Sequence, residues 1–79
     1  MGVQLTASHS GSTVNVQATN TSSGAVTLSA KVLVLLENDT KETVFTNTAT
    51  VLQNGTVILV GQATGPVKHI IDDPEPIIT

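Results

Sequence analysis

The segment 25–36 constrains the fold more than any other part of the chain. Apolar side chains occupy every second position in it, which is the repeat of a β-strand and not of a helix. These residues are Val26, Leu28, Ala30, Val32, Val34 and Leu36. Two of the intervening positions, Leu33 and Leu35, are apolar as well, so the second face of this strand is also partly apolar. A small free-standing sheet normally keeps one face in water, and we therefore expect a partner against that second face.

The run 57–60 repeats this pattern, because four consecutive apolar residues place apolar side chains on both faces of a strand. A further apolar pair stands at the C-terminus, after two prolines. The sequence thus predicts an interface made from apolar residues that the core of one subunit does not need. Its candidate residues are Leu33, Leu35, Ile58, Val60, Ile77 and Ile78.

Turn-forming residues divide the chain into short segments of β-type composition. We expect strands over residues 3–8, 13–20, 25–36, 42–52, 56–63 and 67–71. Asn54-Gly55 is the strongest hairpin signal, because this pair suits the positive φ angles of a type I′ turn. No segment has a helical apolar stripe. The prediction is an all-β fold, either a small antiparallel sandwich or a partly open barrel of about six to seven strands.

Length and composition indicate one small domain with an aliphatic core. Val, Leu, Ile and Phe make up 24 of the 79 residues, more than a disordered chain contains. There is one Phe, no Trp or Tyr and no Cys, so neither an aromatic core nor a disulfide can stabilise the fold. Subunit association is the remaining common source of stability for so short a chain.

Charge separates the C-terminal residues from the rest. Residues 1–71 form the expected β domain, and their three Lys balance three acids. The tail 72–79 holds Asp72, Asp73 and Glu75, which account for the net charge of −3. Two prolines in this tail oppose its entry into a central ladder, so we expect an extended tail. Ile77 and Ile78 would anchor it in a groove of its own subunit or of a neighbour.

The same charge distribution bears on partners. The chain has no Arg and no basic patch, which argues against a nucleic-acid partner. No apolar run approaches 18 residues, so we expect no membrane-spanning segment. The chain also does not open on a basic segment followed by an apolar one, and we expect no signal peptide.

No motif states an enzymatic activity, and we expect no catalytic, cofactor-binding or metal-binding residues. His9 lies among Ser and Gly in an expected turn, without a nucleophile elbow. The cluster formed by His69 and the tail acids lacks the pattern of a calcium loop. By residue type alone, Lys31 could form a covalent cross-link to Asn20 or Asn47 near the carboxyl group of Glu42. A lysine that faces solvent is the simpler interpretation of Lys31.

Residues 13–24, followed by the apolar strand 30–36, resemble the start of many bacterial and viral immunoglobulin-like domains. The resemblance implies an immunoglobulin-like β-sandwich, although the Cys, Trp and Tyr residues typical of antibody domains are missing. The chain also has a general likeness to the small decoration proteins of bacteriophage heads, which are compact β folds rich in Thr and Val. That likeness implies a structural role and assigns no role to any single residue.

Two functional hypotheses follow from these features. The first is a non-enzymatic structural protein of the virion, such as a phage capsid decoration protein, which acts by burying surface. Its partners would be further copies of itself in a homo-oligomer such as a trimer, and a larger assembly such as a capsid shell. The second is an immunoglobulin-like module of a bacterial surface or adhesive protein, extracellular or on the cell surface, with the acidic tail as a linker.

Overall fold

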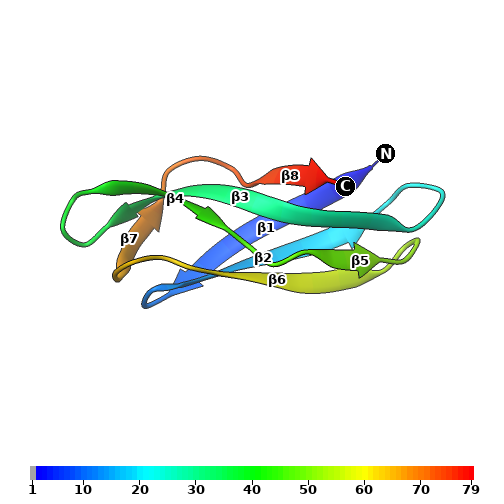
Figure 1. Cartoon of the computed structure of the whole chain (residues 1–79). Coiled ribbons are helices and arrows are strands. Elements are labelled where there is room, and N and C mark those ends of the chain that lie inside the picture. The colour runs from blue at the N-terminus through cyan, green and yellow to red at the C-terminus, as the bar shows by residue number, and fades with distance from the viewer. Residues whose placement is uncertain (1) are drawn as a thin grey trace.

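Two antiparallel β-sheets pack face to face in the computed structural model, which describes residues 2–79 (Figure 1). This confirms the predicted all-β sandwich. No described residue is helical. The strands are β1 (Val3–Ser10), β2 (Thr13–Asn20), β3 (Val26–Leu36), β4 (Lys41–Phe45), β5 (Ala49–Val51), β6 (Thr56–Gln62), β7 (Val67–Ile70) and β8 (Glu75–Ile78).

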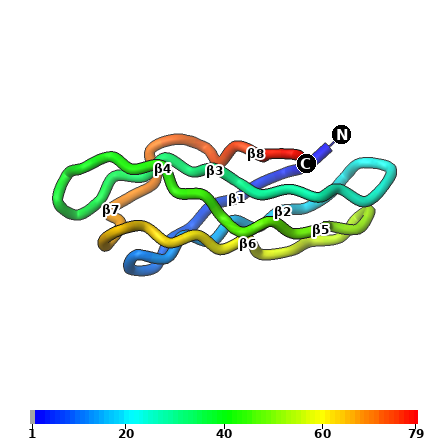
Figure 2. Tube along the Cα trace, in the orientation of Figure 1, coloured from blue at the N-terminus to red at the C-terminus, as the bar shows by residue number. Residues whose placement is uncertain are grey.

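Sheet A has the strand order β1-β2-β6, and sheet B is built around β3. One edge of β3 pairs with β4 and then β5, and its other edge pairs with β7 and then β8. Segment 41–51 therefore runs along one edge of β3 and segment 67–78 along the other edge, and each segment is interrupted once. The expected strand 42–52 is split in this way at residues 46–48, where the chain leans towards β6 and forms the bridge Thr46↔Gly61 (Figure 2).

The core consists of the inward-facing side chains of the two sheets. Strand β3 contributes every second residue to it, as the sequence predicts, because successive side chains of a strand point to opposite faces. All of the buried apolar residues are aliphatic. They are Val14, Val16, Ala18, Leu28, Ala30, Val32, Val34, Leu36, Val44, Val51, Leu59 and Val67.

The C-terminal tail is extended, as expected, but the expectation that it stays out of the ladder of a central strand is wrong. Residues Glu75–Ile78 form β8, which lies along β3. The amide of Thr79 donates to the carbonyl of Thr27 at 2.9 Å, so alternate residues of β8, including Glu75 and Ile77, direct their backbone groups at β3. The nitrogen of Pro76 then faces the free edge, where the missing N–H breaks no ladder bond.

The Asn54-Gly55 turn is present, but it does not make a hairpin. The amide of Gly55 donates to the carbonyl of Leu52 at 2.8 Å, and Asn54 has a φ of 62°. The strands on either side, β5 and β6, belong to different sheets. The predicted type I′ hairpin is therefore wrong. The Asn-Gly pair indicates a turn with a positive φ, but it does not determine which strand the following segment pairs with.

A buried asparagine joins the two sheets at this end of the sandwich. Asn20 is fully buried, and its side-chain nitrogen donates to the carbonyls of Gly24 and Val51 at 2.7 and 2.9 Å. Its side-chain oxygen accepts from the amide and the hydroxyl of Ser22 at 2.9 and 2.5 Å. The backbone of Asn20 also bonds to Gly55 and Asn54. The loop after β2, strand β5 and the turn before β6 are thus held by one residue.

We expect Asn20→Ala to lower the free energy of unfolding by about 2–4 kcal/mol, because it leaves buried carbonyls unpaired and opens a small void. Urea denaturation followed by circular dichroism measures this loss. Gln17→Ala is the matched control, since Gln17 lies in the same strand with an exposed side chain. Equal stability of the two variants would contradict a structural role for Asn20.

Strand β4 of sheet B lies close against Gly61 of β6 in sheet A, and Gly61 is buried. A Cβ atom there would lie 2.7 Å from Cγ1 of Val44 and 2.9 Å from the backbone oxygen of Phe45. We expect Gly61→Ala to destabilise the fold by about 1–3 kcal/mol, because the backbone oxygen cannot move aside without shifting β4. Gly24→Ala is the control, since nothing lies within 4 Å of a Cβ at that position. A thermal melt in which Gly61→Ala matches Gly24→Ala would show that the two sheets can separate at little cost.

Candidate functional site

The outer face of sheet B carries an apolar patch. On β3, Val32 and Val34 are buried while Leu33 and Leu35 point outwards and are half-buried. Phe45 of β4 lies diagonally from Leu33 on the same face and is 60% exposed. We call Leu33, Leu35, Phe45 and Ile77 the sheet B patch. Ile77 lies opposite Ser29 on β3, which places it on this face with an exposure of 38%.

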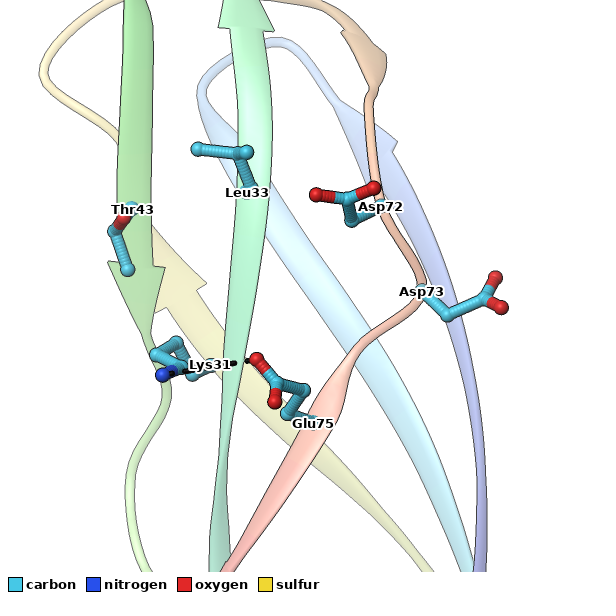
Figure 3. A pocket seen from close by; sticks show the side chains of 6 residues that line it. All are labelled: Lys31, Leu33, Thr43, Asp72, Asp73 and Glu75. Carbon is cyan, nitrogen blue, oxygen red and sulfur yellow. Dashed lines mark ion pairs between the residues drawn. The ribbon is translucent and has the colours of Figure 1, made fainter.

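Charged side chains are interspersed with the sheet B patch and surround it. Nζ of Lys31 lies 3.6 Å from Oε1 of Glu75, across the middle of the face (Figure 3). Leu35 lies between Lys41 of β4 and His69 of β7. An apolar area with a charged rim is the arrangement seen where a soluble protein binds another protein.

A shallow hollow lies beside the patch, where residues 72–74 bulge away from β3 (Figure 3). Its volume is about 180 Å³, below the ~300–1,000 Å³ of a typical ligand pocket. It is also open to solvent, so it does not enclose a small molecule. The residues that line it are Lys31, Leu33, Thr43, Asp72, Asp73 and Glu75.

The outer face of sheet A bears a second, smaller apolar area. Ile58 lies opposite Gln17 and is 55% exposed, and Val60 lies opposite Asn15 and is 42% exposed. Both point away from sheet B. Ile78, which lies opposite Leu28, alternates with Ile77 and is exposed on the other side of β8. The six candidate interface residues therefore lie in three separate places, and none of them is buried.

Two exposed apolar residues were not among the candidates, namely Phe45 and Leu52, of which Leu52 is 70% exposed. Phe45 is the one aromatic residue of the chain and it alternates with Val44 in an expected strand. The alternation of Val44 with Phe45 is the sequence signal that one of the two points outwards. The signal is short because the strand ends at Phe45, after which Thr46 and Asn47 bond to β6. Leu52 lies in the turn between the sheets, where strand periodicity predicts nothing.

Charge is confined to one sheet. All nine Asp, Glu and Lys residues lie between positions 31 and 75, in sheet B or in the loops that join its strands. The three strands of sheet A contain none. The outer face of sheet A is a flat array of Thr, Ser, Asn and Gln side chains around Ile58 and Val60. The charged groups that could recognise a partner therefore belong to sheet B and its loops.

The groups considered for chemistry do not gather into a site. Lys31 pairs with Glu75, while the amide of Asn47 bonds the backbone of Val60, 13 residues away. Glu42 accepts hydrogen bonds from the amide and hydroxyl of Thr64. Asn20, as described, is fully hydrogen-bonded elsewhere. Among residues 2–79 no group of three or more His, Asp or Glu side chains is arranged to hold a metal ion.

No protein-family model matches the chain, and searches of curated proteins and of solved structures found no match. Within residues 2–79 no helix is long and apolar enough to cross a membrane.

An exposed ion pair holds the turn between β3 and β4. Nζ of Lys68 donates to Oδ1 of Asp39 at 2.7 Å. This hydrogen bond and the lysine charge lower the pKa of Asp39, and the carboxylate in turn raises the pKa of Lys68. Because the pKa of Asp39 is lower in the folded state, its stabilising effect is present above the unfolded pKa and is lost as the pH falls through the folded pKa.

We expect Asp39→Asn to lower the melting temperature slightly at pH 7, and to have no effect once the pH is below the pKa of Asp39. Asn tolerates the positive φ of 67° at this position, so the turn conformation is preserved. Thermal melts at a series of pH values test this. A loss that is equal at neutral and strongly acidic pH would show that the ion pair is not its cause.

Proposed function

We propose that this chain is a non-enzymatic structural protein that attaches to a larger assembly through the outer face of sheet B. The observation that carries the proposal is the sheet B patch. Two half-buried leucines, a phenylalanine and an isoleucine share one face of a small domain whose core is already complete without them. Apolar side chains in such a position gain most from burial against a partner.

The dimensions of the domain suggest how strong a single contact is. It measures 42 × 18 × 17 Å, so one broad face has a projected area of about 760 Å² (42 × 18). A standard interface buries roughly 800 Å² on each partner. One face must therefore be used almost completely, and one contact is weak. Repetition of the contact over a symmetric assembly would give firm attachment.

We propose the virion as the setting, with a phage capsid decoration protein as the most specific form of the hypothesis. Support comes from the Thr-rich and Ser-rich surface, the absence of cysteine, and an apolar patch on the outside of a fold too small for a large core. Further copies of the chain and a capsid shell are the partners that this proposal implies.

The strand order favours a second candidate, an immunoglobulin-like module of a surface or adhesive protein. Treating β4–β5 and β7–β8 as one strand each, the sheets have the orders 1-2-5 and 4-3-6. Immunoglobulin-like sandwiches likewise place their first, second and fifth strands in one sheet and their third and sixth in the other. However, β1 begins and β8 ends at the same end of the sandwich (Figure 1), whereas modules in a linear array need them at opposite ends. The paired tail also differs from a free linker.

The double variant Leu33→Ser, Leu35→Ser tests the attachment surface. Since both side chains point outwards, we expect the β-type circular dichroism spectrum to survive. Association should weaken by about 2–4 kcal/mol, which is ~30- to 1,000-fold in affinity. Light scattering on the purified chain over a range of concentrations measures the assembly.

Ile58→Ser, Val60→Ser is the matched control, because it removes two apolar side chains from the outer face of sheet A. Assembly that survives this control but not the Leu33, Leu35 variant supports attachment through sheet B. A wild-type chain that stays monomeric at high concentration argues against the proposal. Collapse of the fold in the Leu33, Leu35 variant would instead place these residues in the core.

A further inference from the structure

Strand β1 has a free edge along its whole length. The amide of Thr21 donates to the carbonyl of Gly2 at 2.7 Å, which continues the β1–β2 ladder by one residue. Residues of an antiparallel strand alternate in the direction of their backbone groups, so the even-numbered residues of β1 bond to β2. The odd-numbered ones therefore direct their N–H and C=O groups away from it. These are Val3, Leu5, Ala7 and His9, and no backbone hydrogen bond is found for their outward groups in residues 2–79.

The neighbouring edges are protected in ways that β1 is not. The edge of β6 is covered at Val60, because Asn47 bonds both backbone groups of that residue. The edge of β8 carries Pro76 and follows the acidic residues Asp72 and Asp73. Prolines and charges are the usual devices that keep exposed strands from pairing with other chains. The eight residues of β1 include neither.

We propose that β1 pairs antiparallel with β1 of a second copy of the chain about a two-fold axis at Thr6, which joins the two A sheets into one. The register places Val3 opposite the partner's His9 and Leu5 opposite the partner's Ala7. All four outward-facing residues of each strand are then paired, with two hydrogen bonds for each pair, or about eight in total. Because the contact is isologous, it closes as a dimer.

The side chains agree with this register. On the outer face Thr6 meets the partner's Thr6, and Gln4 meets the partner's Ser8, so only neutral polar groups come together. If the pairing of the two β1 strands slipped by one residue, side chains that face the core would lie opposite side chains of the outer face. A slip of two residues would leave Val3 opposite the partner's Gly11, which lies in the turn after β1. The register with its two-fold axis at Thr6 therefore pairs the largest number of residues along the edge of β1.

The open side of the sandwich provides apolar surface for the second copy to cover. A hollow there lies between β1 and the chain after β7, and half-buried apolar side chains from both sheets line it. These are Leu5, Ala7, Ile70 and Ile71. The partner's β1 would extend sheet A, and its inward-facing side chains would cover this hollow. On the opposite side, Thr46 and Asn47 connect the two sheets through the bridge Thr46↔Gly61 and the hydrogen bond from the amide of Asn47 to the carbonyl of Val60.

The acidic bulge limits the strength of this pairing. Asp72 and Asp73 line the same hollow, which contains no Lys. Dimerisation about Thr6 therefore brings four carboxylates, two from each copy, towards one another across the two-fold axis. Like charges at a seam weaken association and are screened by salt. Pairing through β1 should thus be weak at low ionic strength and stronger in high salt.

Ala7→Pro tests the proposal. The ring removes an N–H that faces the free edge and leaves the β1–β2 ladder intact. Sedimentation equilibrium of the whole chain, at concentrations up to about 1 mM, should show a wild-type dimer that strengthens with salt. Ala7→Pro should weaken it at least ~10-fold, and Asp72→Asn with Asp73→Asn should strengthen it by a similar factor. Ala7→Val, which keeps the N–H, should dimerise as the wild type does.

Circular dichroism and urea unfolding establish that Ala7→Pro is folded. If it is not, Leu5→Pro offers a second removal of an outward N–H on the same edge. A dimer that tolerates the folded proline variant, or no dimer at any salt concentration, overturns the proposal. The Leu33→Ser, Leu35→Ser variant separates this contact from the sheet B patch, because it should leave the β1 dimer intact.

Discussion

Strand β3 is the element on which the rest of the structure depends. Its inward face supplies five of the buried core residues, and every other strand of sheet B pairs with one of its two edges. An 11-residue strand can do this because neighbours on each side share its length, β4 and β5 along one edge and β7 and β8 along the other. Its outward face then has no strand left to contact, which is why Leu33 and Leu35 remain at the surface.

The two interruptions beside β3 have different consequences for the molecule. At residues 46–48 the chain leaves β3 and bonds to β6, which closes one side of the sandwich. At residues 72–74 it bulges away from β3 without a backbone hydrogen bond to sheet A, which leaves a hollow on that side and places two carboxylates there. One side is therefore joined by backbone hydrogen bonds, while the other exposes the free edge of β1 with two carboxylates of the neighbouring chain segment beside it.

Much of the fold could be predicted because its signals are local. The alternation in 25–36 identifies a strand and its buried face, and turn residues locate five of the six expected strands to within two residues at each end. The destination of a strand after a turn could not be predicted, as Asn54-Gly55 shows, since the same turn joins strands within one sheet or between two. Because proline is excluded from central strands, the sequence predicts a tail outside the ladder, whereas the edge position that the tail occupies admits Pro76.

By itself, the sequence determined the strand period, the aliphatic core and the surplus of apolar residues, because these follow from side-chain type and spacing. Only the tertiary structure decided how that surplus is distributed. It separates Leu33 and Leu35 from Ile58 and Val60 on opposite outer faces, and it brings Phe45 beside Leu33. It also confines all charge to sheet B and leaves β1 as a free edge. Such relations depend on which strands pair across long separations in the chain, and no local pattern encodes that choice.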